Sequence, residues 1–102
     1  MSRAIVRIPT PLRSFTGGAD EVTVEGATVA ELLADLGRLH SGVSNRILDE
    51  RGDVRPFINV FVGGKNLRSL GGLAAPVTEG DIIAIIPAVA GGASVSTWRG
   101  RR

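Results

Sequence analysis

The sequence predicts an α+β fold in which one main helix packs across a mixed sheet of four or five strands. Short runs of β-branched residues near both ends of the chain predict strands. One segment between them repeats leucine and valine at helical spacing. The predicted order is therefore two strands, a helix and then further strands, the last of which is rich in isoleucine.

Two strands are expected before the helix. Residues 4–8 form a compact apolar run that the prolines of residues 9–11 close, which is typical of a strand followed by a loop. Leu12 and Phe15 in this loop are candidates to fold back onto the core. After a glycine turn, residues 21–25 alternate polar and apolar side chains, as a half-exposed strand does. The two strands should form an antiparallel hairpin with a long loop.

The main helix is expected to begin after Thr28. Thr28 and Glu31 have the spacing of a capping box, in which the hydroxyl and the carboxylate each accept a hydrogen bond from a free backbone N–H. Ser41 and Gly42 should end this helix, and His40 in its last turn is interpreted as structural. The apolar stripe that should face the sheet consists of Val29, Leu32, Leu33, Leu36 and Leu39.

A short second helix and two more strands are expected next. Ser44 could cap the short helix. Residues 57–62 predict a third strand, with Ile58, Val60 and Val62 on one face and Phe57, Asn59 and Phe61 on the other. The glycines at positions 63 and 64 predict a hairpin turn into a short fourth strand at residues 65–68.

Residues 82–86 predict the last strand, and Pro87 should end its regular pairing because proline has no N–H to donate. Both the odd-numbered and the even-numbered positions of this strand are apolar, which predicts that both of its faces are covered. Parallel pairing of the first and last strands at the centre of the sheet would explain why both are so apolar. This layout is that of a β-grasp fold, the fold of ubiquitin.

Composition limits the functions that this chain of 102 residues can have. Its length suits one small domain, no apolar run is long enough to span a bilayer, and no signal-type segment follows the first residues. We therefore expect a cytoplasmic protein that does not bind membranes. The absence of cysteine and the single histidine exclude a disulfide framework, a thiol nucleophile and a zinc cluster of the common types. We expect no bound cofactor.

The excess of positive charge lies at the C-terminal end. Residues 1–92 hold nine of the twelve lysines and arginines and all ten acids, so they sum to −1, and the remaining charges are those of Arg99, Arg101 and Arg102. A specific nucleic-acid binder carries a broad basic face, so we expect no nucleic-acid partner. No acid and base stand at a recognisable catalytic spacing, which argues against an enzyme.

A short apolar arm follows the last strand and ends in two glycines. Because glycine has no Cβ, the end formed by Ala90, Gly91 and Gly92 can enter a passage that is too narrow for larger residues. Three other glycine pairs occur in the chain, and turns explain them better. The arm predicts a chain end that is presented to another protein.

The β-grasp order and the ending from Pro87 to Gly92 resemble the ubiquitin-like sulfur carriers of the ThiS/MoaD family. Residues 8–13, 16–18 and 57–60 are similar to one branch of it, the carriers that supply sulfur for cysteine biosynthesis. The resemblance covers residues 3–92. Two alternatives remain open, a small subunit of molybdopterin synthase and a ubiquitin-like binding module that carries no sulfur.

The resemblance implies a protein co-substrate and not an enzyme. In such carriers an E1-like adenylyltransferase/sulfurtransferase uses ATP to adenylate the terminal glycine carboxylate, which a sulfur donor then converts to a thiocarboxylate. The corresponding residue here is Gly92. The sulfur would pass to a synthase of the cysteine synthase type, or to the large subunit of molybdopterin synthase in the first alternative.

The sequence departs from the family pattern because residues 93–102 follow Gly92, whose carbonyl is therefore part of a peptide bond. Residues 1–92 are the expected carrier domain, and residues 93–102 are expected to be a flexible, removable extension. Two explanations are open. The chain is a natural precursor that a zinc metallopeptidase trims, or the extension was added by cloning or readthrough.

Partner contacts are expected near the C-terminal arm. Phe57 and Phe61 are candidates for an exposed apolar patch, together with Pro87 and Val89 of the arm. The alternative is that both phenylalanines are buried in the core.

Overall fold

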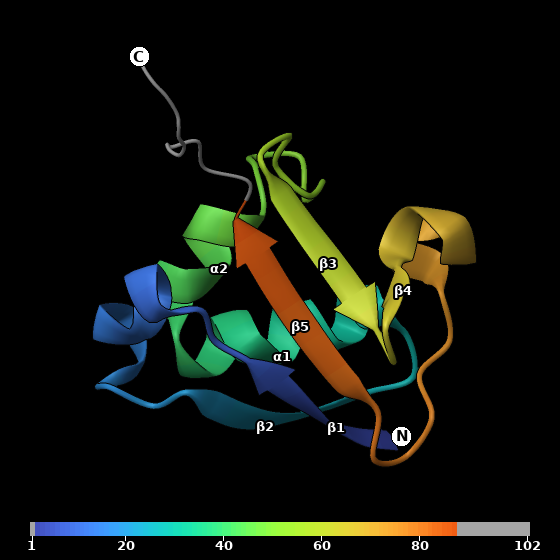
Figure 1. The fold of residues 1–102 in the computed structure, drawn as a ribbon, viewed down its shortest axis with the longest axis horizontal. Helices are drawn as coiled ribbons and strands as arrows, with labels where there is room; N and C mark the ends of the chain where they lie inside the picture. Colours follow the sequence, from blue (N-terminus) through green and yellow to red (C-terminus); the bar gives the residue numbers. More distant parts are fainter. Residues whose placement is uncertain (1, 88–102) are drawn as a thin grey trace.

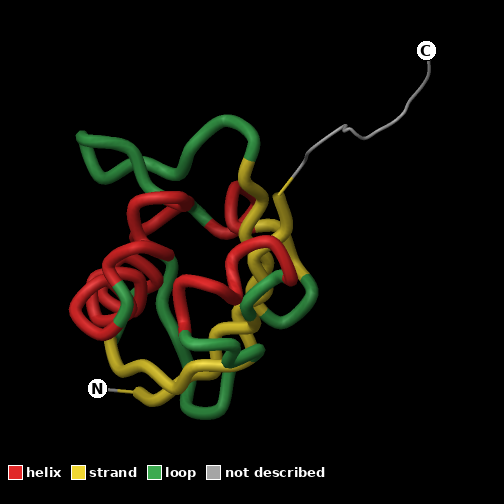
Figure 2. Tube along the Cα trace, turned by 90° about the vertical axis from the view of Figure 1, so that its left-hand side faces the viewer, coloured by secondary structure: helices red, strands yellow, loops and turns green. Residues whose placement is uncertain are grey.

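The computed structural model describes residues 2–87, which form a five-stranded mixed sheet with the strand order β2-β1-β5-β3-β4 (Figure 1). The helices α1 and α2 lie on the same side of this sheet (Figure 2). The strands are β1 (Ser2–Arg7), β2 (Glu21–Gly26), β3 (Ile58–Val62), β4 (Lys65–Asn66) and β5 (Ile82–Pro87). The predicted β-grasp fold is confirmed.

The last strand lies at the centre of the sheet. β5 pairs with β1 in parallel, with Ile5 opposite Ile82, and pairs with β3 in the antiparallel direction. β1 and β2 form the expected antiparallel hairpin. The first and last strands thus pair as the sequence predicts.

The connection from β1 to β2 contains a 3₁₀ helix, η1 (Thr10–Thr16), where a loop was expected. Leu12 from this helix is buried in the core. Phe15 stays at the surface, where its ring lies against Gly42 and under the guanidinium of Arg46, 4.8 Å from the ring centroid. The ring fills the space that a side chain at position 42 would need, so η1 packs closely on the second helix.

The main helix α1 (Val29–Leu39) begins as predicted. The Glu31 N–H donates to Thr28 Oγ1 at 3.3 Å, and Glu31 Oε1 accepts the Ala27 N–H at 2.8 Å. The apolar stripe is buried at Val29, Leu32, Leu33 and Leu36. The prediction is wrong for Leu39, which is 45% exposed because the helix ends there and the chain leaves the helical conformation at His40.

A second helix, α2 (Ser41–Ile47), follows directly. Ser41 and Gly42 begin this helix and do not form the expected turn, and Ser44 lies inside it and does not cap it. Seven residues are too few for a stable helix in isolation, so tertiary packing must stabilise α2. Val43 and Ile47 supply that packing, since both are fully buried.

The turn after β3 forms as predicted, but the strand that follows it, β4, is shorter than predicted. Gly63 and Gly64 both have positive φ, 57° and 87°, as a two-residue hairpin turn requires. β4 ends at Asn66 and does not reach residue 68. The reason is that the Asn66 side chain accepts the Arg68 N–H at 2.9 Å and so begins a 3₁₀ helix, η2 (Leu67–Leu70). A further turn, η3 (Gly72–Ala74), precedes the last strand.

Within residues 2–87 only one face of β5 is covered, so the prediction that both faces are covered is wrong. Ile83 and Ile85 point into the core, where they are 0% and 3% exposed. Ile82 and Ile86 are 45% and 48% exposed. The difference arises because α1 and α2 both pack on the same side of the sheet (Figure 2).

Candidate partner-binding surface

The predicted reactive end of the chain lies just beyond β5. Val89, Ala90, Gly91 and Gly92 lie outside the described residues. Pro87 is the last residue of β5, is half-buried and pairs with Ile58. The arm therefore starts beside β3, since the parallel pairing of β5 with β1 ends at Ala84.

The sheet face opposite the helices carries an apolar surface. Alternate residues of a strand point to opposite faces, so the neighbours of the buried Val6, Val60, Ile83 and Ile85 point away from the core. We call this surface the open face. It consists of Ile5, Asn59, Phe61, Ile82, Ala84 and Ile86.

The open face is continuous across three strands. In the register of the sheet, Ile5 lies opposite Ile82, and Phe61 lies opposite Ala84. Ile86, near the end of β5, lies opposite Asn59. Directly opposite residues contact one another, so these side chains form one strip that runs toward the end of β5. Exposed apolar patches are typical of interaction sites, so the open face is a candidate docking surface.

The two predicted phenylalanines lie at the surface and not in the core. Phe57 precedes β3 and is 72% exposed. Phe61 is half-buried and belongs to the open face. The alternative of two buried phenylalanines is therefore wrong, and their role in docking stays a prediction.

Charged residues flank the open face and are partly paired. Arg7 Nε lies 3.8 Å from Glu21 Oε2, and Arg3 Nε lies 3.4 Å from Glu79 Oε2. The Arg3 N–H also donates to Glu79 Oε1 at 2.9 Å. This hydrogen bond, followed by the positive charge of Arg3, lowers the pKa of Glu79 below its usual value. Arg3 thus stabilises the ionised form of Glu79.

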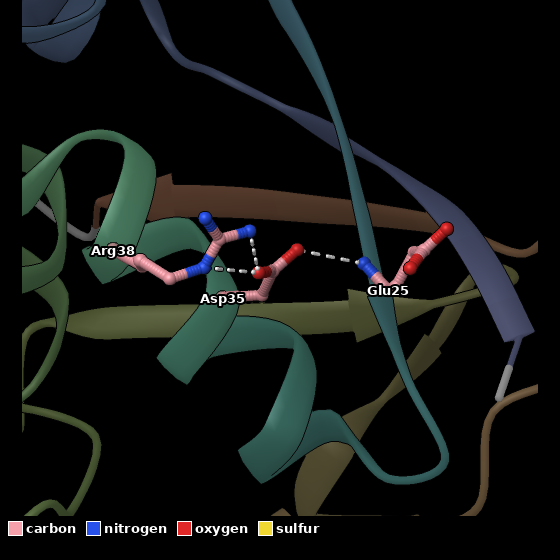
Figure 3. A network of polar contacts seen from close by, with 3 residues as sticks. All are labelled: Glu25, Asp35 and Arg38. Carbon is pink, nitrogen blue, oxygen red and sulfur yellow. Dashed lines mark hydrogen bonds and ion pairs between the residues drawn. The ribbon is translucent and has the colours of Figure 1, made fainter.

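A side chain from α1 accepts a hydrogen bond from the outer edge of β2, as Figure 3 shows. Asp35 on α1 accepts the Glu25 N–H at 3.0 Å and is held by the Arg38 guanidinium, with Nη2 at 2.6 Å and Nε at 3.0 Å. The Glu25 N–H, and after it the Arg38 side chain, lower the pKa of Asp35. An unpaired edge N–H would otherwise be free to bind another strand.

Residues 2–87 contain no cluster of side chains suited to bind a metal ion. Nowhere in this range do three His, Cys, Asp or Glu side chains gather closely enough to hold a metal ion. No helix within the same range has the length and the apolar character needed to cross a membrane. The surface that stands out chemically is the open face.

Ile5, Ile82 and Ile86 were not predicted as surface residues. The predicted elements could nevertheless have indicated that these residues are exposed. One main helix can cover only one side of a five-stranded sheet, so apolar residues of the other parity in the central strands must remain exposed.

Comparison with known proteins gives a consistent result. The profile of the ThiS family matches residues 6–92. The sulfur carrier protein CysO of Mycobacterium tuberculosis is 42% identical over 89 residues, which cover 85% of this chain and 96% of the relative. A crystal structure of a BexX/CysO complex from Amycolatopsis orientalis matches at 45% identity with a TM-score of 0.81, covering 87% of this chain and 99% of that one. The small archaeal modifier protein 1 of Methanosarcina acetivorans matches at 28% identity with a TM-score of 0.78, covering 90% and 98%.

Proposed function

The chain belongs to the ThiS family and is a sulfur carrier of the CysO type, and from this premise we propose that it carries sulfur as a thiocarboxylate on Gly92 for cysteine biosynthesis. The observation that carries the proposal is the 42% identity to CysO over 96% of the length of that relative. The family match supports the same site, since it ends at Gly92 and excludes residues 93–102.

The proposed chemistry begins with a free carboxylate on Gly92. A carboxylate oxygen attacks the α-phosphorus of ATP on an E1-like partner, pyrophosphate leaves, and an acyl adenylate forms. A sulfur nucleophile at the oxidation level of sulfide, HS⁻, then attacks the carbonyl carbon, AMP leaves, a proton is released, and the product is a thiocarboxylate. AMP is a good leaving group, whereas the oxygen of a free carboxylate is not. The carrier supplies the reacting carbon and the partner enzymes supply the catalysis.

The free carboxylate requires removal of residues 93–102. We include in the proposal that a peptidase, of the zinc-dependent type, cuts after Gly92. The glycines at positions 91 and 92 suit both steps because they present no side chain to a narrow active site. A molybdopterin synthase partner is less well supported, because the corresponding match, a molybdopterin converting factor subunit of Pyrococcus furiosus, is 22% identical and shares only the fold.

The open face is the proposed docking surface for the E1-like partner and the accepting synthase. It runs along β5 toward Pro87, so a partner seated on it would have the arm within reach. Exposed isoleucines next to a phenylalanine supply the apolar centre that protein interfaces use. Phe57, beside the same end of β5, extends the surface.

Intact-protein mass spectrometry of the full chain expressed in its own host tests the proposal. The expected result is a species that ends at Gly92, part of which carries sulfur in place of one oxygen. A chain that remains whole to Arg102 while the host depends on sulfur transfer would contradict the proposal and favour a binding module that carries no sulfur.

A further inference from the structure

Strand β3 is paired unequally on its two edges. β5 pairs with it along its full length, from Ile58 to Val62. β4 pairs only with Phe61 and Val62 on the other edge. Among the described residues, none forms a strand beside residues 58–60 on that edge.

Some main-chain N–H and C=O groups of residues 58–60 point to the edge of β3 that has no neighbouring strand. The Gly63 N–H donates to the Ile82 carbonyl at 3.1 Å, and the direction of these groups alternates along a strand. Val60 and Ile58 therefore direct their N–H and C=O groups away from β5. A turn already uses the Ile58 N–H, which donates to the Arg55 carbonyl at 3.0 Å.

A cavity of about 260 Å³ lies beside this edge. Its apolar lining comes from three parts of the chain and consists of Val54, Ile58, Val60, Leu67 and Leu73. Sites for small molecules usually have 300–1,000 Å³, so this cavity is better suited to one large apolar side chain. A side chain from an added strand would enter from the edge of β3.

At the opposite edge of the sheet, formed by β2, a side chain already binds an outward main-chain N–H. On β2, Asp35 occupies the outward N–H of Glu25 at 3.0 Å and blocks the addition of a strand there (Figure 3). A blocked edge is a common protection against unwanted pairing. Residues 58–60 have a cavity beside them instead of such a block.

Two exposed charged residues at the rim of the cavity, one at each end, favour one direction for an added strand. Asp53 lies in the segment that leads into β3, and Arg68 lies in η2 after β4. Within residues 2–87, neither side chain takes part in an ion pair. A strand antiparallel to β3 would begin at the Arg68 end and finish at the Asp53 end.

We propose that residues 58–60 of β3 accept an extended peptide segment of a partner protein as an antiparallel strand. The segment carries a large apolar residue opposite Ile58 for the cavity, an acidic residue two positions before it, opposite Val60, for Arg68, and a basic residue two positions after it for Asp53. In this register the segment does not overlap β4, which pairs with Phe61 and Val62. Residues two positions apart share a face of a strand, so all three side chains meet the cavity together. Strand addition of this kind takes affinity from the main chain and specificity from the side-chain pocket.

Two synthetic peptides with blocked ends test the proposal by NMR titration of the isotopically labelled full chain. The first is Glu-Thr-Leu-Thr-Lys and the second is its reverse, Lys-Thr-Leu-Thr-Glu. The first should shift the amide signals of residues 58–60, Leu67 and Leu73, and should bind about threefold more tightly than the reverse, as two exposed charge pairs allow. Absence of shifts at millimolar peptide, or shifts confined to the open face, would overturn the proposal.

Matched variants separate strand addition from simple apolar contact. The double variant Asp53→Lys with Arg68→Glu changes two exposed side chains, so the fold should be preserved and the preference between the two peptides should invert. The first peptide with an N-methylated leucine lacks the central N–H donor and should lose most of its affinity. Equal binding of the methylated peptide, or an unchanged preference in the double variant, would reject the proposed mode.

Discussion

Pro87, the last residue of β5, lies opposite Ile58 at the start of β3. This pairing positions the end of β5 beside β3, whereas the parallel pairing of β5 with β1 ends at Ala84. The arm that leads to Gly92 thus starts beside β3, and the open face lies along β5.

The substitution Gly92→Ala, in a chain that ends at residue 92, should lower the rate of thiocarboxylate formation by on the order of 100-fold. The added methyl group would displace the carboxylate in the narrow active site of the partner, and small displacements of reacting atoms are costly. Mass spectrometry of the loaded fraction over time measures this rate. The thermal unfolding midpoint should not change, and loading at the wild-type rate would contradict the role of Gly92.

Replacement of Ile82, Ile86 or Phe61 by serine should weaken binding of the E1-like partner by about 1–2 kcal/mol each. The reason is the loss of apolar contact at the centre of the proposed interface. Calorimetric titration measures the affinity. Leu39→Ser is a matched control, since Leu39 is as exposed as Ile82 but lies on α1. Unchanged affinity of the three variants with an intact fold would exclude the open face as the docking surface.

The substitution Leu36→Ala should lower the free energy of unfolding by about 2–5 kcal/mol, because Leu36 is fully buried and the change leaves a cavity in the core. Leu39→Ala, one turn along the same helix, should change it by less than about 0.5 kcal/mol. Urea unfolding of both variants measures the difference. Equal losses would mean that Leu39 packs in the core in solution.

Asp35→Asn should remove a pH-dependent part of the stability. The pKa of Asp35 is lowered in the folded state by the Glu25 N–H and then by Arg38, so its carboxylate stabilises the fold above the usual value of about 4. This contribution is lost as the pH falls through the lowered pKa. The difference in unfolding free energy between wild type and variant should therefore be largest near neutral pH and shrink below about pH 4.

Urea unfolding at several pH values measures this difference, in which the other carboxylates cancel. Arg38→Gln is the companion variant, because it removes the second cause of the shift and keeps the first. Its pH dependence should lie between those of wild type and Asp35→Asn. A constant difference between wild type and Asp35→Asn from pH 7 to pH 3 would mean that the contact in Figure 3 does not affect stability in solution.

Local patterns in the sequence were sufficient for most of the fold. The capping spacing from Thr28 to Glu31, the β-branched strands and the glycine turn at residues 63–64 each depend on neighbours in the chain. The predicted pairing of the first and last strands followed from the β-grasp order of the elements, and the register of Ile5 with Ile82 confirms it. The family, too, could be recognised from the sequence, since its characteristic ending is a run of consecutive residues.

The tertiary structure alone decided which apolar residues remain at the surface. Ile82, Ile83, Ile85 and Ile86 are alike in sequence, yet two are buried and two are exposed. Their burial depends on which side of the sheet the helices cover, and that is a relation between distant segments. The same holds for the cavity beside β3, which is lined by residues 53–54, 58–60, 66–68 and 72–73. Sequence spacing determines the period of a helix or strand, whereas exposure depends on what the rest of the chain leaves uncovered.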